Sequence, residues 1–255
     1  MNTLLEAKEV KKTYQLGKEN SATVLKGVDL RIDRGDFVSV MGPSGSGKST
    51  LLYTVSGMDR MSSGSVRFKE REIASMSEKE LAALRLSEMG FIFQQIHLLK
   101  NLNVFDNIIL SGYLGKGRRR NLVDRRAEEL MELTGIADLA GNTITQASGG
   151  QLQRVGICRA LINEPDILFG DEPTGALDSK SAAEIMNLLK QINSRGTTVM
   201  LVTHDIKVAS KTDRVYFMLD GLITARKELG RYDGDPTEGR RREEELTGWL
   251  LEQGL

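Results

Sequence analysis

The sequence predicts an α/β fold with a parallel sheet covered by helices, and three patterns along its 255 residues carry this prediction. The part after residue 148 alternates between helical and strand-like apolar spacing, which is typical of a parallel, helix-covered sheet. Short apolar runs before residue 70 predict further strands near the N-terminus. A long stretch of helical periodicity lies between these two parts, so we expect a helical insertion that interrupts the sheet.

The strands and helices are predicted from apolar period and from turn residues. Before residue 70, the expected strands are 24–32, 37–41 and 65–68. After residue 148, the expected elements are helix 152–161, strand 167–169, helix 181–193 and strand 198–202.

Two further helical segments precede residue 148. Ser77 and Glu80 form a capping-box pattern before leucines at helical spacing, which predicts a short amphipathic helix over 77–86. The segment 104–136 is predicted to be mostly helix, with an apolar face opposite its charged residues. No internal repeat of 20 to 50 residues is found.

Composition excludes several classes of protein. Lys plus Arg number 35 and Asp plus Glu number 35, so the formal net charge is zero, which excludes a strong sequence-blind nucleic-acid binder. No apolar run approaches the roughly 20 residues of a transmembrane helix. Cys158 is the only cysteine, and the N-terminal segment lacks the apolar core of a signal peptide. We therefore expect a chain of a reducing cytoplasm.

The sharpest motif is a loop rich in glycine and serine between strand 37–41 and an expected helix. Its residues are Gly42, Pro43, Ser44, Gly45, Ser46, Gly47, Lys48, Ser49 and Thr50. Backbone N–H groups in such a loop, at a helix N-terminus, can surround the phosphates of a nucleotide. Lys48 is expected to reach the β- and γ-phosphates, and the Ser49 hydroxyl to ligate Mg²⁺. The alternative is a flexible Gly/Ser-rich loop.

Two adjacent carboxylates end the apolar strand before Pro173. At the carboxyl end of a parallel strand they can face a nucleotide crevice. Asp171 suits a water-mediated contact to Mg²⁺, and Glu172 suits orienting and deprotonating an attacking water. The alternative interpretation is a pair of solvated acids in a turn.

A Ser-Gly-Gly-Gln turn between these motifs resembles the signature of the ATPase subunits of ABC transporters, although Ala147 stands where that family usually has Leu. Its residues are Ser148, Gly149, Gly150 and Gln151. A Gly-Gly turn that opens a helix is a second anion site, and the resemblance implies that it acts in trans on ATP held by another copy. The alternative is a helix-capping serine followed by a glycine turn.

The resemblance implies a P-loop NTPase (RecA-like) core with antiparallel N-terminal strands and an inserted helical subdomain. The ABC ATPase domain is expected over residues 4–230, with the core at about 4–92 and 156–230 and the helical subdomain at about 95–155. A polar linker and a short amphipathic helix are expected over 231–255.

Other site residues follow from the resemblance, position by position. Tyr14 is similar to the aromatic residue that stacks on adenine, while an isolated tyrosine would more often belong to a core or a surface. Gln94 is similar to the glutamine that touches Mg²⁺ or water, with Gln95 as its adjacent competitor. His204 follows a strand end, where it can donate to the γ-phosphate. The loop expected to cross a dimer interface contains Ala176, Leu177 and Asp178.

The expected function follows from the same resemblance. It implies an ATP-hydrolysing subunit with ATP and Mg²⁺ as cofactors, which pairs with a second copy or a homologous ATPase chain and drives a transmembrane permease. The motifs resemble the subgroup of macrolide export, antimicrobial-peptide resistance and lipoprotein release, so a peptide, lipopeptide, lipoprotein or hydrophobic drug is the expected cargo. The chain would lie on the inner face of the cell membrane through its permease. The alternative is an ATP-switched regulatory dimer that signals through a membrane partner without transport.

Two segments have no role within that family pattern. A basic cluster, which we define as Lys116, Arg118, Arg119, Arg120, Arg125 and Arg126, is expected to be a solvated helix face or a contact to anionic lipid head groups or an acidic permease loop. In the tail, Leu246, Trp249 and Leu250 recur at helical spacing and predict a one-sided helix, which we expect to dock on its own chain rather than on a second protomer. Cys158 is expected in the core, and His97 without a role in the site.

Overall fold

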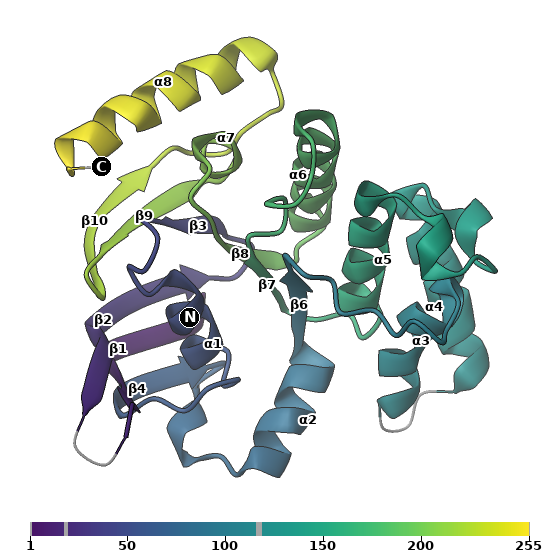
Figure 1. Ribbon diagram of the computed structural model, residues 1–255, viewed down its shortest axis with the longest axis horizontal. Coiled ribbons are helices and arrows are strands. Elements are labelled where there is room, and N and C mark those ends of the chain that lie inside the picture. Colours follow the sequence, from purple (N-terminus) through teal and green to yellow (C-terminus); the bar gives the residue numbers. More distant parts are fainter. Residues whose placement is uncertain (1, 18–19, 116–118, 255) are drawn as a thin grey trace. The chain divides into compact units, whose positions relative to one another are not determined.

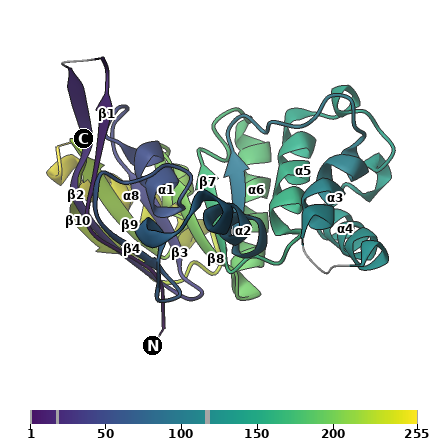
Figure 2. The same ribbon diagram turned by 90° about the horizontal axis from the view of Figure 1, so that it is seen from below.

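The computed structural model describes residues 2–17, 20–115 and 119–254 (Figures 1 and 2). The chain forms two compact units: unit 1 contains residues 1–81 and 198–255, and unit 2 contains residues 82–197. These boundaries come from the packing of the chain and differ from the predicted limits of core and helical subdomain, which stay a prediction.

Unit 1 begins with an antiparallel sheet, as predicted for the N-terminal strands. Its strands lie in the order β2-β1-β4-β5. Their bounds are β1 Thr3–Gln15, β2 Ser21–Asp33, β4 Ser63–Phe68 and β5 Arg71–Glu72, followed by the short 3₁₀ turn Ile73–Ser75. The register of β1 against β2 shifts at several points, and Glu9 within β1 has a positive φ of 49°. Such irregularities bend and twist a long strand.

The second sheet of unit 1 carries the strands that lead into the candidate site. Strand β3 (Phe37–Met41) pairs in parallel with β8 (Thr198–Val202) and with β9 (Arg214–Leu219). Strand β10 (Leu222–Glu228) pairs antiparallel with β9. Every residue of β3 and β8 is buried. This explains why both read as short, continuous apolar runs, as parallel strands covered on both faces do.

Three helices of unit 1 accompany these strands. Helix α1 (Lys48–Val55) starts directly after the loop that follows β3, and the four-residue α7 (Ile206–Ala209) follows β8. Helix α8 (Pro236–Glu252) forms the C-terminal end and lies along β9 and β10 in Figure 1. The helix begins within the segment expected as a polar linker, because Asp235 caps it through the backbone N–H of Thr237.

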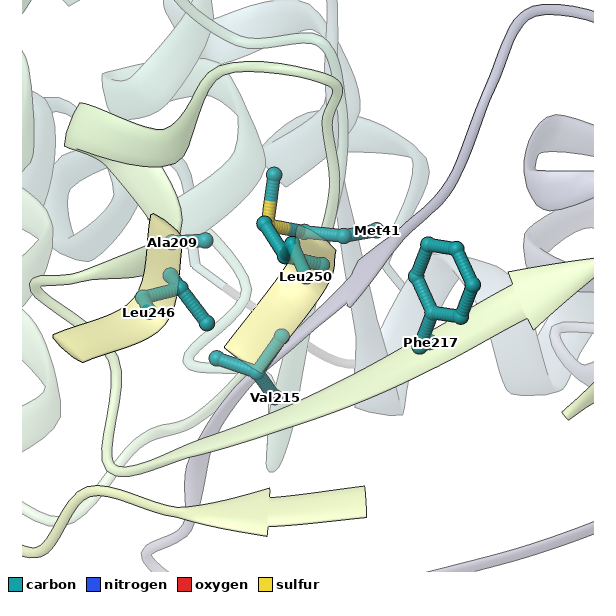
Figure 3. Packing of buried hydrophobic residues seen from close by; sticks show 6 residues of the cluster. All are labelled: Met41, Ala209, Val215, Phe217, Leu246 and Leu250. Atoms are coloured by element: carbon teal, nitrogen blue, oxygen red, sulfur yellow. The ribbon is translucent and has the colours of Figure 1, made fainter. Parts of the chain in front are cut away.

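Helix α8 docks on its own chain through one apolar stripe. Leu246 and Leu250 are completely buried against residues from β3, α7 and β9 (Figure 3). Those partners are Met41, Ala209, Val215 and Phe217. The ring of Trp249 meets that of Phe217 edge to face, with 6.3 Å between centroids. The tail therefore belongs to the core of unit 1.

Unit 2 combines two parallel strands with a group of helices. Strand β6 (Met89–Phe93) pairs with β7 (Ile167–Asp171). The helices are α3 Val104–Leu114, α4 Arg120–Thr134, α5 Gly149–Leu161 and α6 Ser179–Ser194, and 3₁₀ turns cover Ala137–Leu139 and Ile144–Gln146. Helices α3, α4 and α5 lie side by side in both views (Figures 1 and 2). Helix α2 (Glu78–Glu88) crosses the boundary between the units, and Ser77 and Glu80 form its predicted capping box.

The expected helical stretch 104–136 is divided into α3 and α4, and the basic cluster lies at this division. Lys116 and Arg118 lie outside the described residues. Arg120 stands over the Tyr113 ring at 5.3 Å, while Arg125 and Arg126 contact Glu129 at 3.2 and 3.7 Å. The Arg125 pair is exposed, as on a solvated helix face, whereas the Arg126 side chain is half-buried. Within the described ranges, no helix combines the length and the apolar character that spanning a bilayer requires.

Candidate functional site

The phosphate loop lies between β3 and α1, as predicted. Gly47 caps α1 with a φ of 104°, a conformation that glycine adopts without strain. Gly42 has no room for a side chain, because a Cβ there would lie 2.0 Å from the carbonyl oxygen of Met218. The Lys48 Nζ donates to the carbonyl oxygens of Gly42 and Pro43, at 2.8 and 2.9 Å. The loop therefore encloses an ammonium group at the N-terminus of a helix, which is the electrostatic setting of an anion site.

One buried hydroxyl in this loop is suited to bind an oxyanion. Ser46 is buried, and its Oγ has no hydrogen-bond partner among the described residues. The backbone of Ser46 is held in place, since its carbonyl accepts from the Gly221 N–H at 3.0 Å and its N–H donates to the Pro43 carbonyl at 3.3 Å. A buried hydroxyl without a partner costs free energy that a bound oxyanion can recover. The loop thus fits a phosphate chain on an observation independent of its motif.

Tyr14 and His204, the other two predicted site residues of unit 1, come from different strands. Tyr14 lies near the end of β1, is half-buried, and donates its hydroxyl to the Asp59 carboxylate at 2.6 Å. His204 is exposed and follows Thr203, directly after the end of β8. Unit 1 therefore carries the residue predicted to touch the base and, apart from the signature turn, the residues predicted to touch the phosphates.

The predicted metal and base residues of unit 2 gather at one edge of the β6–β7 pair. Phe93 is paired with Asp171, so Gln94 and Glu172 both follow at the carboxyl ends of parallel strands. Gly175 marks their convergence, since a Cβ added there would lie 3.0 Å from the Gln94 Nε2 and 3.5 Å from the Glu172 Cβ. Gln94, Asp171 and Glu172 therefore lie at one edge, because the carboxyl ends of neighbouring parallel strands share an edge.

Glu172 has an unusual backbone. Its φ is 46°, and its carbonyl oxygen accepts from the Gly175 N–H at 3.0 Å, which closes a tight turn after β7. Glutamate rarely occupies the left-handed region, and such strain is concentrated at functional sites.

The signature turn packs against the segment that follows Glu172. Ser148 caps α5 and forms a reciprocal capping box with Gln151, with distances of 3.3 and 2.8 Å. A Cβ on Gly150 would lie 3.2 Å from the Ser181 Oγ, and one on Gly149 would lie 3.6 Å from a Leu177 methyl. The contact at Gly150 is tight and that at Gly149 is an ordinary van der Waals distance, so the turn packs closely on the N-terminus of α6.

Asp178 is the N-cap of α6. Its carboxylate accepts from the backbone N–H groups of Lys180 and Ser181, both at 3.0 Å, and from the Ser181 hydroxyl at 2.7 Å. These hydrogen bonds from Ser181 and Lys180 hold the pKa of the Asp178 carboxyl below its ordinary value. Ala176 is exposed and Leu177 half-buried. The predicted interface loop is thus kept in shape by its own helix cap.

Sequence reasoning missed the residues that support the site. Arg159 on α5 donates to the carbonyl oxygens of Ile96 and His97, at 2.6 and 3.0 Å, and thereby fixes the loop after Gln94. Burial lowers the pKa of this guanidinium, which nevertheless keeps two carbonyl partners. A charged residue on the apolar side of the expected helix 152–161 was the available signal. His97 contributes its carbonyl and an edge contact to Phe93.

Cys158 lies on the buried face of α5, as predicted. Burial raises the pKa of its thiol to about 12, and the Thr134 hydroxyl lies 3.2 Å from the sulfur. Such a thiol is chemically inert at neutral pH. Across the described ranges, no group of three or more His, Cys, Asp or Glu side chains could by itself hold a metal ion.

Comparison with known proteins gives this geometry a family. Residues 25–175 match the family model described as ABC transporter, which covers the phosphate loop, the signature turn and the two carboxylates. The chain belongs to the ABC transporter family. The fold is that of an ATP-binding cassette, since 90% of this ABC chain superposes on the whole of MJ0796 with a TM-score of 0.82 and 38% identity. MJ0796 was solved as a dimer in a post-hydrolysis state bound to ADP and Pi.

Two curated relatives of this ABC family member are named for export. The Macrolide export ATP-binding/permease protein MacB of Bdellovibrio bacteriovorus is 40% identical over 96% of this chain, and this chain spans 37% of the length of that relative. The Bacitracin export ATP-binding protein BceA of Halalkalibacterium halodurans is 43% identical over 89% of each chain. The predicted likeness to the macrolide and antimicrobial-peptide subgroup of the ABC family is confirmed.

Proposed function

We propose that this chain binds and hydrolyses ATP as the nucleotide-binding subunit of an ABC transporter. The observation that carries the proposal is the phosphate loop, in which Lys48 is enclosed and the buried Ser46 hydroxyl lacks a partner. The ABC family match and the ADP and Pi of MJ0796 support it. Hydrolysis would then proceed by positioning and charge neutralisation rather than through a covalent intermediate.

Each proposed role uses a residue whose place is described above. Tyr14 stacks on adenine, and the loop N–H groups with Lys48 hold the β- and γ-phosphates. Mg²⁺ would be held by the Ser49 hydroxyl and Gln94, with Asp171 through water, and it would neutralise part of the negative charge of the phosphates. Ser49, Gln94 and Asp171 offer a hydroxyl, an amide and a carboxylate oxygen, which are the ligands that a hard cation prefers.

Two residues act on the attacking water and the phosphate that leaves. Glu172 orients the water and takes its proton, a role that its place directly after the end of β7 supports. His204 at the end of β8 donates to the γ-phosphate.

A second copy of the chain completes the site in this proposal. Ser148, Gly149, Gly150 and Gln151 offer the N-terminus of α5 to the γ-phosphate of the partner's ATP. The loop with Ala176, Leu177 and Asp178, which packs against this turn, would line the interface. The dimeric state of MJ0796 supports a pair of chains around two ATP.

The partner and the cargo are proposed by similarity to the relatives. We propose a transmembrane permease as partner and export or extraction of a peptide, lipopeptide, lipoprotein or hydrophobic drug as the work performed. The names of MacB and BceA support export. The chain would lie on the cytoplasmic face of the membrane through that permease. The alternative is an ATP-switched regulatory dimer, which would change a membrane partner in response to ATP without moving cargo. Transport assays on vesicles reconstituted with the co-purified complex distinguish the two.

The substitution Glu172→Gln tests the catalytic part. It should leave ATP binding intact, trap an ATP-bound dimer, and lower kcat at least roughly 100-fold, the usual contribution of a general base. Glu164→Gln is the matched control, because Glu164 is an exposed glutamate of unit 2 with a similar positive φ of 54°. Hydrolysis by the Glu172 variant at the wild-type rate would refute the assignment.

A further inference from the structure

The Tyr14 side chain is held by two residues that belong to no motif of the sequence. Lys12 and Tyr14 are two positions apart on β1, so their side chains share one face of the sheet. The Lys12 Nζ stands 4.6 Å from the centroid of the Tyr14 ring. Asp59 accepts the Tyr14 hydroxyl on one oxygen at 2.6 Å and the Lys12 ammonium on the other at 2.5 Å. The three side chains form a closed triangle of contacts.

This triangle is tied to the helix that starts at the phosphate loop. The backbone N–H groups of Met58 and Asp59 donate to the carbonyl oxygen of Tyr53 in the last turn of α1, at 2.9 and 3.0 Å. Lys12 also donates to the Arg60 carbonyl at 2.6 Å. Hydrogen bonds and one ion pair therefore run from the Tyr14 ring through Asp59 to α1, whose first residue is Lys48.

The charges in the triangle are balanced at neutral pH. Lys12 is buried to 8% exposure, and an ammonium group so withdrawn from water needs an anionic partner. Burial raises the pKa of the Asp59 carboxyl, but hydrogen bonds from Lys12 and Tyr14 outweigh it and leave that pKa below its ordinary value. Burial and the Asp59 carboxylate raise the pKa of the Tyr14 hydroxyl, so it remains a donor. The Asp59 carboxylate and the Tyr14 hydroxyl thus keep the protonation states that the contacts need.

We propose that Asp59 and Lys12 are positioning residues for nucleotide selection: they hold the Tyr14 ring in one orientation and at a set distance from the phosphate loop. The inference rests on the proposed ATP site. The Lys12 ammonium covers one face of the ring, so an adenine base stacks on the opposite face. A ring held before the base arrives loses little conformational entropy on binding, which favours ATP over a phosphate chain without a base.

The test compares two ligands, ATP and inorganic tripolyphosphate, on the full-length chain. Their dissociation constants are measured by calorimetry or by displacement of a fluorescent ATP analogue. Base stacking on an aromatic side chain contributes roughly 1–3 kcal/mol. We expect Asp59→Asn and Lys12→Met to weaken ATP binding about tenfold, which corresponds to ~1.4 kcal/mol, and to leave tripolyphosphate binding unchanged.

The control variant is Lys8→Met on the same strand. Lys8 forms an exposed ion pair with Glu6 at 3.0 Å, outside the triangle, so its replacement should change neither affinity. A second measurement places Asp59→Asn in a Tyr14→Ala background. If Asp59 acts through the ring, it should have no further effect on ATP affinity there, although the single substitutions each weaken binding.

Three results would overturn the proposal: equal weakening of both ligands, no weakening of either, or an undiminished effect of Asp59→Asn when Tyr14 is absent. Equal weakening would mean that Asp59 supports the phosphate loop itself and not the ring. If the wild-type chain bound no ATP, the proposed function would fail first. If it bound ATP and the Asp59 and Lys12 variants bound ATP equally well, only the positioning role would fail.

Discussion

Arg242 provides the most demanding test of how unit 1 is assembled. It lies in the middle of α8, is 1% exposed, and directs its guanidinium into the seam between that helix and the chain after α7. Its three nitrogens donate to four backbone carbonyl groups at distances of 2.6 to 3.1 Å. Those acceptors belong to Ser210, Thr212, Leu229 and Gly230. The Tyr232 ring lies 5.3 Å from the guanidinium carbon, and Glu238 contacts it at 3.4 Å.

The substitution Arg242→Met keeps an unbranched apolar side chain and removes every one of these donors. Each buried carbonyl left without a partner costs about 1 kcal/mol, so four of them cost about 4 kcal/mol. Some carbonyl groups will reach water at the seam, which brings the expected loss of unfolding free energy to about 3 kcal/mol. For a chain of this size, each kcal/mol lowers Tm by roughly 2–4 °C, so Tm should fall by about 6–12 °C.

The assay is thermal unfolding followed by circular dichroism or calorimetry, at one protein concentration and without nucleotide. Arg241→Met is the matched control, because Arg241 is the preceding residue, has a side chain that is 67% exposed, and contacts Glu238 and Glu245 at 4.0 and 3.6 Å. Exposed pairs of this kind contribute at most about 1 kcal/mol. Equal melting temperatures for the two variants would refute the assignment of Arg242 as the anchor of α8.

Two further predictions use the pKa shifts of unit 2 and unit 1. The Cys158 thiol, with its pKa raised to about 12, should not react with a thiol-specific aromatic disulfide at pH 8 while the chain is folded. After unfolding in urea, one thiol per chain should react. Fast labelling of the folded protein would contradict the burial of Cys158. The pKa of the Asp59 carboxyl is lower in the folded chain than its value of 3.8 in the unfolded chain. Asp59 should therefore stabilise the fold at pH values above 3.8, and this contribution should be lost as pH falls through the folded pKa. Wild type and Asp59→Asn should therefore differ in urea-unfolding free energy at pH 7, and this difference should shrink as pH falls below 3.8, whereas a gap that widens in acid would show the opposite sign.

The strands nearest the site were predictable because their surroundings are uniform. Strands 37–41 and 198–202 are buried on both faces, so each is a continuous apolar run whose limits match β3 and β8. Parallel strands place their carboxyl ends together, which allowed Asp171 and Glu172 to be predicted at the end of strand 167–169, whereas Gln94 was predicted from the family resemblance alone. The capping pair Ser77 and Glu80 is equally local, and its hydrogen bonds are those that the pattern requires.

Strands β1, β6, β9 and β10 had no such signal. In β1, Glu9 adopts a left-handed conformation and the register shifts on both sides of it, so the alternation of buried and exposed residues is broken. Strand β10 alternates between half-buried and exposed positions and has no fully buried residue. It therefore contains charged residues, and its sequence shows no regular apolar spacing. These features depend on partner strands and cannot be deduced from a local window.

The start of α8 was hidden by its composition. The segment around Arg240–Arg242 is strongly charged, and charge runs usually indicate a solvated linker. Arg242 is nevertheless buried, because the carbonyl groups after α7 and β10 accept its hydrogen bonds. No local sequence pattern shows these acceptors. The same limit applies to Asp59, whose partners Lys12 and Tyr14 come from a strand far away in the sequence.

The anchor of α8 and the phosphate loop rest on the same two strands. Met41, the last residue of β3, packs against α8, and the next residue is Gly42 of the loop. On β9, Phe217 contacts Trp249, while the following residue, Met218, sets its carbonyl against Gly42. Because Gly42 has no space for even a methyl group, a shift of either strand acts directly on the loop. The stability supplied by Arg242 and the geometry that holds Lys48 are therefore properties of one packed assembly, and a loosened α8 should weaken nucleotide binding as well as lower Tm.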